Sequence, residues 1–431
     1  MRDAKMRARR TVAIALRARI REWHYSSLPE VLCIQRRAGL HLLIAAVSAC
    51  ASCSKYNDGL VLLRRSFLFL PLGWTAACRP RRGSGFPGYA FVANQQGRAI
   101  AVVDLMAFAL TRHIPLPGAP SSVLAVPARK RVYVLTPESG SVHEIDTSRL
   151  APAREFRARG RLVSMRAASD GEALWILSAE PRQLLKVSLD DMKVKWQANL
   201  PAEPWDFELS PDGRTAAVSL GTAGSLSLVD LEARRVGKPV PTGEFCGALR
   251  FRGDGRQVLA ADPARRRLVI VEAASARVVT SLALAVKPEN LCFKADGGEL
   301  FVTGEGMDAV VIVSPYYTEV AETVLAGRAP GAMAISRSPE YLFVANPPTG
   351  DVTILDVETR RVVAVAPVGE EPGFIVITPD DQYALILDRR TGNMAVIRLS
   401  TVVPRRTRGA PLFTTIPVGS GPVSAVVAAV A

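Results

Sequence analysis

Histidine is scarce in this sequence, and its scarcity excludes several chemistries. Four of the 431 residues are histidine, and only His113 and His143 lie after residue 88. A haem with an axial histidine, or a Ser-His-Asp triad, needs a histidine beside its partner groups, and no such arrangement is visible. The sequence also has no His and Cys cluster with metal-ligand spacing and no glycine-rich phosphate loop. We therefore predict no metal site and no cofactor, and a haem or quinone redox protein is the weakest functional class.

Cysteine is too rare to build a disulfide framework. Four of the six cysteines lie in the leader before the repeats begin, namely Cys33, Cys50, Cys53 and Cys78. Only Cys246 and Cys292 lie in the rest of the chain. A single bridge between these two stays open as an alternative, and two buried free thiols are the simpler expectation.

A strongly basic folded region is missing as well. The net charge is +14, but residues 1–88 hold 16 Lys and Arg against four acids, a net of +12, so residues 89–431 carry only +2. A nucleic-acid partner would need a basic face on the folded part, and we expect no such partner. Hydrophobic residues make up 48% of the chain and charged residues 22%, which is the composition of a protein with an apolar core.

The leader has no hydrophobic run of the length that spans a membrane, yet it contains two short apolar stretches. The second stretch follows Arg64 and Arg65, covers residues 66–74 and is followed by small residues that end in Cys78. A charged segment, a short apolar segment and small residues before a cleavage point are the parts of a secretory signal. The ending resembles a bacterial lipobox, in which Cys78 would be lipidated. A similar stretch that ends in Cys50 is the alternative, and an unprocessed membrane anchor is a further one.

These features divide the chain into four parts. We expect residues 1–60 to be a misassigned N-terminal extension or a disordered leader, and residues 61–78 to be a lipoprotein-type signal segment. Residues 79–88 are expected to be a linker, and residues 89–431 the folded domain. The protein would then be exported to the periplasm or the outer cell envelope and would touch the membrane only through its lipid anchor.

A 42-residue repeat organises the chain after Tyr89. Short apolar strands end at positions that keep this 42-residue interval, which are Asp104, Asp146, Ser188, Asp230, Glu272, Ser314, Asp356 and Arg398. Turns of the Asp-Gly type keep the same interval, as at residues 170–171, 212–213, 254–255 and 296–297. The carboxylates that end the strands are expected to cap turns, which is a simpler role than calcium binding.

Each repeat contains four short strands and no segment with helical spacing. In the seventh copy these are residues 341–346, 351–356, 361–366 and 373–378. A four-stranded antiparallel sheet of this kind cannot bury its two apolar faces alone, and copies stacked radially bury them against each other. We therefore predict an all-β fold, a β-propeller with eight four-stranded blades, with seven blades as the alternative. Residues 421–430 should pair with the first strands and close the ring, and the basic insertion at residues 404–409 should be a surface loop.

The repeats resemble those of the YVTN family of β-propeller proteins, a group that includes surface-antigen and lactonase-like propellers. The resemblance covers residues 89–431. It depends on the segments 91–94, 133–136, 301–304 and 343–346, on the strand that ends in Asp, on Val-Gly before a Pro at 368–369 and 418–419, and on Pro379-Asp380. The resemblance implies a propeller, often exported, and no single activity.

The resemblance also implies that the segment after the repeated Pro supplies the innermost strand of each blade. One set of alternate residues on these strands is apolar and should be core: Val123, Met165, Phe207, Leu249, Leu291, Met333, Ile375 and Ala425. The opposite set should line the central channel, and it contains the polar cluster Arg166, Asp206, Glu208, Arg250 and Asn290. One hypothesis is a site in which two guanidinium groups bind a small anion or carboxylate. The alternative is an Arg-Glu-Arg row that satisfies itself. His113 and His143 lie inside strands and should be surface residues.

Two classes of function remain after these exclusions. The first is a non-catalytic binding or scaffold protein whose partner is an unknown protein, glycan or small anionic ligand; we expect it to be a monomer. The second is a lactonase-like hydrolase that uses the channel. The hydrolase would need several acids or amides that converge at one end of the channel, where Asp206, Glu208 and Asn290 are the candidates.

Overall fold

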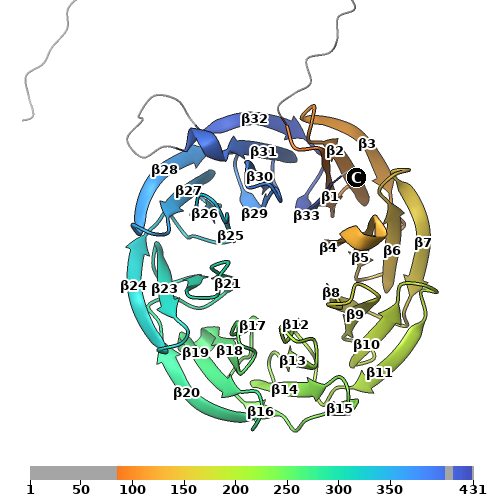
Figure 1. Cartoon of the computed structure of the whole chain (residues 1–431), viewed down its shortest axis with the longest axis vertical. Helices are drawn as coiled ribbons and strands as arrows, with labels where there is room; N and C mark the ends of the chain where they lie inside the picture. Colours follow the sequence, from red (N-terminus) through yellow and green to blue (C-terminus); the bar gives the residue numbers. More distant parts are fainter. Residues whose placement is uncertain (1–84, 403–410, 430–431) are drawn as a thin grey trace, which may run out of the picture. The chain divides into compact units, whose positions relative to one another are not determined.

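The described residues fold into eight antiparallel sheets arranged as the blades of a β-propeller (Figure 1). The computed structural model describes residues 85–402 and 411–429. Four predicted features lie outside the described residues. They are the leader, the start of the linker, the lipidation residues Cys78 and Cys50, and the insertion at residues 404–409. We number the blades I to VIII in chain order and name their strands from the channel outward.

Blades I to IV contain the first half of the repeat region. Blade I consists of β33 (Pro422–Ala429), β1 (Gly88–Asn94), β2 (Ala99–Asp104) and β3 (Ala109–Pro115). Blade II consists of β4 (Ser122–Val126), β5 (Arg131–Thr136), β6 (Ser141–Asp146) and β7 (Ala151–Arg157). Blade III consists of β8 (Leu162–Ala167), β9 (Ala173–Ser178), β10 (Gln183–Ser188) and β11 (Val194–Asn199). Blade IV consists of β12 (Asp206–Leu209), β13 (Thr215–Ser219), β14 (Ser225–Asp230) and an outer strand in two pieces, β15 (Arg235–Val236) and β16 (Val240–Pro241).

Blades V to VIII complete the ring. Blade V consists of β17 (Leu249–Phe251), β18 (Gln257–Asp262), β19 (Arg267–Glu272) and β20 (Arg277–Ala283). Blade VI consists of β21 (Asn290–Phe293), β22 (Leu300–Thr303), β23 (Ala309–Ser314) and β24 (Glu319–Leu325). Blade VII consists of β25 (Met333–Ile335), β26 (Tyr341–Asn346), β27 (Asp351–Asp356) and β28 (Arg361–Pro367). Blade VIII consists of β29 (Pro372–Ile377), β30 (Tyr383–Asp388), β31 (Asn393–Arg398) and β32 (Leu412–Pro417).

Helical structure in the described residues is limited to three single turns of 3₁₀ helix. These are η1 (Pro127–Arg129), η2 (Pro263–Arg265) and η3 (Leu399–Thr401). Accordingly, the described part of the chain contains no helix with the length and apolarity that a bilayer crossing requires.

The structure confirms the predicted fold class and the predicted strands. The four strands expected in the seventh repeat correspond to β26, β27, β28 and β29. The first three belong to blade VII, whereas β29 is the innermost strand of blade VIII. The sequence repeat is therefore offset from the blade by one strand, and this offset allows a C-terminal strand to complete the first blade.

Turn geometry repeats with the same period as the sequence. After the third strand of blades I to VII, one non-glycine residue takes a left-handed φ of +51° to +58°, at Phe108, Leu150, Met192, Arg234, Ala276, Thr318 and Arg360. The carboxylate that ends the third strand caps this turn: Asp104 Oδ1 accepts the backbone N–H groups of Met106 at 2.7 Å and of Ala107 at 3.2 Å. In blade II the Ser148 hydroxyl is the main cause that lowers the pKa of Asp146 to about 2. The expected capping role is confirmed.

The turns between the first and second strands need glycine in four blades. Gly171, Gly213, Gly255 and Gly297 have φ angles of +67° to +74°, a conformation in which a Cβ is strained. The preceding Asp caps each turn, as when Asp212 Oδ1 accepts the N–H of Arg214 at 3.1 Å. These are the Asp-Gly turns that the sequence predicts.

The core lies between neighbouring blades, where sheets pack face to face. One cluster joins blades VII and VIII through Phe343, Ile354 and Ile386, and an equivalent cluster joins blades I and VIII through Val92, Leu385 and Ala425. The predicted inner-strand core residues are at most 9% exposed, except Met333, which is half-buried. Each sheet thus buries both faces only because it has a neighbour on each side.

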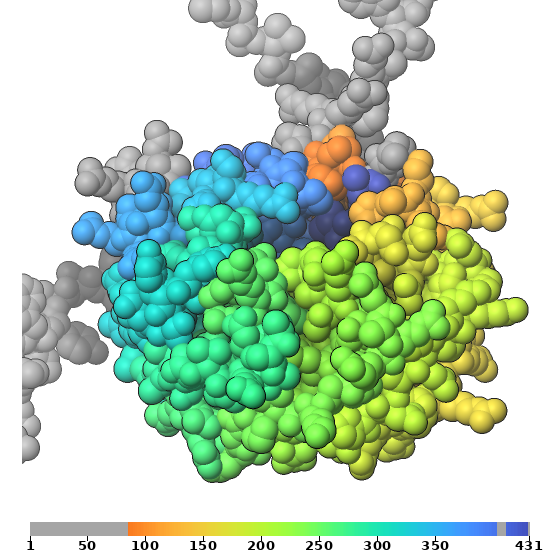
Figure 2. All heavy atoms as spheres, turned by 60° about the horizontal axis from the view of Figure 1, so that its bottom comes forward, coloured from red at the N-terminus to blue at the C-terminus, as the bar shows by residue number. Residues whose placement is uncertain are grey.

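The C-terminal strand closes the ring as predicted. β33 pairs antiparallel with β1 over the register Gly88↔Ala429 to Asn94↔Pro422. Asn94 Nδ2 donates to the carbonyl of Val418 at 2.5 Å, which ties the end of β1 to the loop before β33. In Figure 2 the first described residues (orange) lie beside the last blade (blue), as this pairing requires.

The prediction that both histidines are surface residues is wrong for His143. His113 is exposed on β3, whereas His143 on β6 is only 5% exposed and its Nε2 lies 3.1 Å from Thr136 Oγ1. Burial lowers the pKa of His143. Its position inside a strand suggested a surface residue, but all six residues of β6 are buried.

Candidate ligand site in the central channel

The five predicted channel residues come from four consecutive inner strands. Arg166 lies on β8, Asp206 and Glu208 on β12, and Arg250 on β17, while Asn290 begins β21. Because side chains alternate along a strand, Met165, Phe207 and Leu249 are buried in the core, and the residues beside them lie on the opposite face of each inner strand. The local sequence thereby places polar groups of adjacent blades side by side.

The structure brings four of these residues together in one charged row. Arg166 Nη2 lies 3.1 Å from Asp206 Oδ1, and Arg166 Nε lies 3.6 Å from Glu208 Oε2. Arg250 Nη1 lies 3.6 Å from the same oxygen and donates to its neighbour's carbonyl, that of Leu249, at 2.7 Å. The two contacts of Glu208 with Arg166 and Arg250 are ion pairs, because 3.6 Å is too long for a hydrogen bond. We call these four residues the charged row.

The charged row is balanced in charge and partly exposed to solvent. Two guanidinium groups face two carboxylates, and their side chains are 22% to 32% exposed. Burial raises the pKa of Glu208, and the two neighbouring Arg side chains oppose this shift only in part. The geometry matches the self-satisfying row, and the two arginine side chains each remain 32% exposed.

Asn290 lies next to the charged row without joining it. It pairs in register with Thr303 of β22, and its side chain makes no hydrogen bond to another described residue. Cys292, two positions further along the same strand, packs against the core between blades VI and VII near Arg250, and burial raises the pKa of its thiol to about 11. Cys246 has the same raised pKa of about 11 for the same reason; both cysteines are free thiols, as expected, with Cys246 buried and Cys292 half-buried.

An aromatic rim lies beside the charged row and was missed at the sequence level. Trp205, immediately before Asp206, is 57% exposed, and its ring meets that of Phe245 edge to face at 5.2 Å. The two rings line a cavity of about 510 Å³ together with Lys287 and Glu289. The chain enters all the inner strands from one face of the ring, which we call the entry face. The residues that line this cavity lie in loops on the entry face. The signal in the sequence was positional: Trp205 and Glu289 occupy the same repeat position, immediately before the channel-facing residue.

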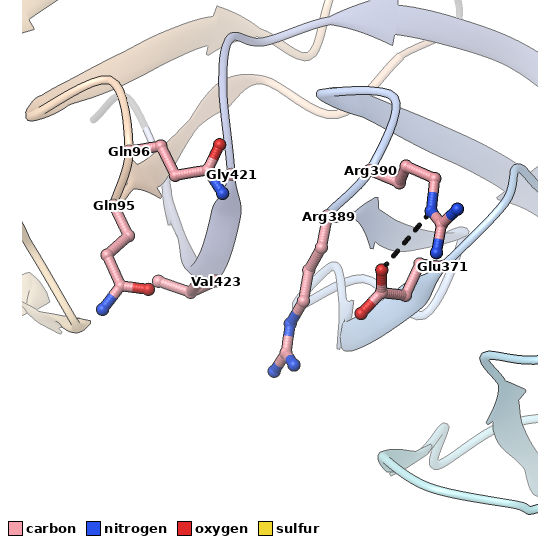
Figure 3. A pocket seen from close by; sticks show the side chains of 7 residues that line it. All are labelled: Gln95, Gln96, Glu371, Arg389, Arg390, Gly421 and Val423. Atoms are coloured by element: carbon pink, nitrogen blue, oxygen red, sulfur yellow. Dashed lines mark ion pairs between the residues drawn. The ribbon is translucent and has the colours of Figure 1, made fainter.

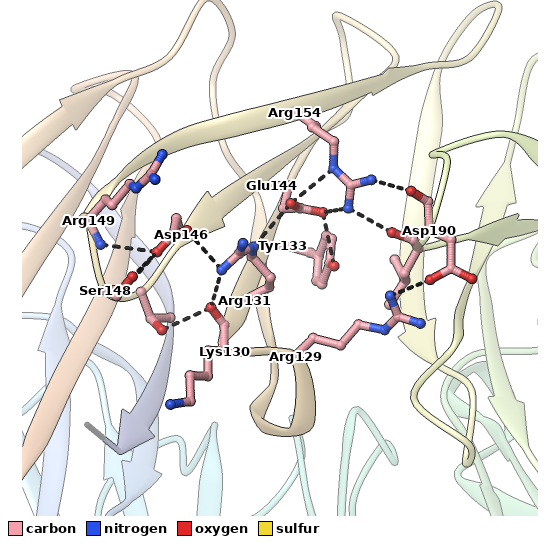
Figure 4. Close-up of polar contacts among 12 residues, drawn as sticks. Arg129, Lys130, Arg131, Tyr133, Glu144, Asp146, Ser148, Arg149, Arg154 and Asp190 are labelled. Carbon is pink, nitrogen blue, oxygen red and sulfur yellow. Dashed lines mark hydrogen bonds and ion pairs between the residues drawn. The ribbon is translucent and has the colours of Figure 1, made fainter. Parts of the chain in front are cut away.

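A second charged cluster is buried between blades II and III (Figure 4). Glu144 on β6 is 1% exposed and accepts hydrogen bonds from Tyr133 Oη at 3.1 Å, Arg131 Nε at 3.2 Å and Arg154 Nη2 at 2.5 Å. Arg154 also donates to the carbonyl of Leu189 at 2.7 Å, in the next blade. Every polar atom of the Glu144 side chain is satisfied, so this cluster joins two blades and has no capacity left for a ligand.

The described residues contain no group of three or more His, Cys, Asp or Glu side chains that could hold a metal ion. No protein-family model matches the sequence, and no curated protein does.

Several solved structures have a similar fold. Dihydro-heme d1 dehydrogenase NirN in complex with DHE is 16% identical over 81% of this chain and 76% of that chain, with a TM-score of 0.66. Kuenenia stuttgartiensis hydrazine synthase is 19% identical over 65% of this chain and 96% of that chain, with a TM-score of 0.53. The β-propeller domain of Myceliophteria thermophila Cps50 (Swd1) is 17% identical over 65% of this chain and 98% of that chain, with a TM-score of 0.53.

The fold and these similarities define the chain as a β-propeller protein. Its particular form is an eight-bladed ring closed by a C-terminal strand. The neighbours include both enzymes and a propeller domain of another kind, and at these identities they show the fold alone.

Proposed function

We propose that this propeller is a non-catalytic binding protein of the YVTN type, whose ligand enters the channel from the entry face and contacts the charged row. The observation that carries the proposal is the charged row, in which the side chains of Arg166 and Arg250 are each 32% exposed, with the exposed Trp205 next to Asp206 in the sequence. Tryptophan and arginine are the side chains that most often dominate binding energy at interfaces. Asn290 supplies a further amide without a partner among the described residues.

The ligand class favoured by this arrangement is a small anion or a carboxylate. An incoming anion would take the place of Glu208 against Arg166 or Arg250, and the cost is reduced because burial already disfavours the Glu208 carboxylate and raises its pKa. Guanidinium groups bind carboxylates through paired N–H donors. The charge balance of the row predicts modest affinity.

The test uses citrate and inorganic phosphate in calorimetric titrations of the full chain. We expect Arg166→Ala and Arg250→Ala each to weaken binding by roughly tenfold, because each removes a charged hydrogen-bond donor. Arg214→Ala is the matched control, since Arg214 and Glu232 form an ion pair whose side chains are 67% and 68% exposed. The proposal fails if the two channel variants change only the melting temperature.

A lactonase-like hydrolase is the second candidate, and one observation favours it. Asp206 and Glu208 lie in the same channel, and burial raises the pKa of Glu208, as suits a group that exchanges protons. The same preparations are therefore assayed for lactone hydrolysis with added Mg²⁺ or Ca²⁺. We expect no turnover; turnover that disappears in Glu208→Gln would replace the binding proposal with the hydrolase.

We further propose that the protein is exported and tethered to the cell envelope as a monomer by a lipid on Cys78, with Cys50 as the alternative. The support is the charged, short apolar and small-residue order of residues 64–78. Cys78→Ala is expected to move the protein from the membrane fraction to the soluble fraction, and Cys53→Ala is the control. Unchanged fractionation of Cys78→Ala, together with release of Cys50→Ala, would move the anchor to Cys50; unchanged fractionation of both would contradict a lipid anchor.

A further inference from the structure

A polar cavity lies at the seam where the first and last blades meet (Figure 3). It has a volume of about 530 Å³, and its lining residues are Gln95, Gln96, Glu371, Arg389, Arg390, Gly421 and Val423. Gln95 and Gln96 follow β1 and Val423 lies on β33, so one wall is blade I. Glu371 precedes β29, and the two arginines follow β30, so the other wall is blade VIII. The cavity opens on the entry face, and its volume is that of a small-molecule site.

The two arginines of this cavity differ in their partners. Arg390 Nε lies 3.8 Å from Glu370 Oε2 and 3.7 Å from Glu371 Oε2, and its charge is thereby matched. Arg389 is exposed and forms no ion pair with a described residue. In Figure 3 its guanidinium points away from Arg390 and Glu371, on the side toward which the Gln95 amide also extends. Arg389 is thus a positive charge without a counter-charge among the described residues.

Glycines leave the space that the side chains of Arg389 and Gln96 occupy. A Cβ at Gly373 would lie 2.9 Å from Arg389 Cζ and closer still to its Nε, so the guanidinium rests directly against that glycine. A Cβ at Gly421 would lie 2.7 Å from Gln96 Cγ in the same way. In blades V and VII the residues equivalent to Arg389 are Pro263 and Pro347, which pack against Gly247 and Gly331. The same close contact with a glycine therefore recurs in three blades, and in blade VIII the residue that contacts the glycine is an arginine.

The backbone around the cavity is also fixed by hydrogen bonds. The N–H of Gln95 donates to the carbonyl of Gly421 at 2.9 Å, and the N–H of Arg389 donates to the carbonyl of Glu371 at 3.0 Å. The buried carboxylate of Asp388 accepts the N–H groups of Glu370 and Glu371. A site that is held in place before binding loses less entropy when a ligand arrives.

We propose that this cavity binds a small hydroxylated carboxylate, such as a sugar acid, with Arg389 as the carboxylate-binding residue and Gln95 and Gln96 as partners for hydroxyl groups. A guanidinium presents a planar pair of donors that matches a carboxylate. Each glutamine amide can both donate and accept, as hydroxyl groups require. Among the lining residues, two arginines and one glutamate give a net charge of +1, which suits one carboxylate better than a phosphate dianion.

This inference does not depend on the charged row, because the cavity is built by blades I and VIII and the row by blades III to V. It has a structural consequence of its own. A ligand that spans both walls would link the first and last blades, so binding should also raise the melting temperature of the ring.

The experiment is a calorimetric titration of the full chain with D-glucuronate, with D-glucose and inorganic phosphate as comparison probes. We expect binding of D-glucuronate, at least about tenfold weaker binding of D-glucose because it lacks the charge, and weaker binding of phosphate. Binding of phosphate that is tighter than that of glucuronate would overturn the assignment of a carboxylate, and equal binding of glucose would overturn the role of charge. Absence of glucuronate binding to the folded wild-type chain would overturn the proposal.

Variants locate the binding to this cavity. Arg389→Gln should weaken glucuronate binding by at least about tenfold, and Gly373→Ala should weaken it several-fold because the new methyl group displaces the guanidinium. Glu371→Gln should strengthen it, by roughly twofold to fivefold, because a negative charge is removed from the wall. Arg328→Gln is the control, since it removes an exposed arginine from the loop before blade VII, at the repeat position of Glu370 and outside this cavity. Equal effects of Arg389→Gln and Arg328→Gln, with circular dichroism showing both folded, would contradict the site.

Discussion

A chain that ends at Pro417 should fail to form a stable ring. Without β33, blade I would retain three strands, and β1 would present an unpaired edge to the channel. The core cluster between blades I and VIII would also lose Ala425 and Val427, which are 5% and 8% exposed in the intact protein. We therefore expect this shortened chain to show no cooperative thermal transition when unfolding is followed by circular dichroism, and to aggregate on warming.

The control for this deletion is a chain that lacks only residues 430 and 431, which follow β33. That chain should melt like the full-length protein because every β1 to β33 pair is retained. If the chain that ends at Pro417 melted cooperatively at the same temperature as the control, blade I would not depend on the C-terminal strand for closure.

Glu144→Gln should lower the free energy of unfolding by about 3 kcal/mol, because the substitution breaks a buried ion-pair cluster. Removing one partner of a buried ion pair leaves a charge without compensation and typically costs about 3 to 5 kcal/mol. The lower end applies here because Arg131 and Arg154 are 30% and 40% exposed and can regain water. The change also replaces one of the two acceptor oxygens by an NH2 group, which cannot accept the hydrogen bonds that Tyr133, Arg131 and Arg154 donate to the carboxylate. Urea unfolding followed by tryptophan fluorescence measures the difference.

The matched control for Glu144→Gln is Glu232→Gln. Glu232 pairs with Arg214 at 3.2 Å, but the two side chains are 68% and 67% exposed. Its replacement should therefore change stability by less than about 0.5 kcal/mol. Equal effects of the two substitutions would mean that the cluster between blades II and III does not contribute as a buried network.

The fold could be predicted from the sequence because the same physical requirement recurs in every repeat. In blades I to VII the third strand ends in a residue that leads into a turn with a left-handed residue, and carboxylates such as Asp104 cap that turn. Glycines such as Gly213 mark the turn between the first and second strands. These are local demands on single residues, so they leave a mark on the sequence. The burial of His143 could not be predicted in the same way, because it depends on coverage of β6 by a neighbouring blade.

A candidate site could be predicted from the sequence only where its residues share the same position in successive repeats. The charged row was found because Arg166, Glu208 and Arg250 share a repeat position on the inner strands. Arg389 was missed because its significance depends on Gly373, on the preceding strand β29, and on the C-terminal Gly421 and Val423 across the seam. Such a site forms only when the first and last blades meet, and no pattern within one segment of the sequence predicts it.

The most direct test of the closed ring is a disulfide trap between its first and last strands. Ala90 and Val427 are register partners, so Ala90→Cys with Val427→Cys should form a disulfide that links the two peptides in mass spectra of the oxidised protein. Ala90→Cys with Val426→Cys should not, because a shift of one position turns the side chain to the other face of the sheet. Closure by β33 in this register predicts a bridge in the first pair alone. No bridge there, or equal bridging in both pairs, would contradict it.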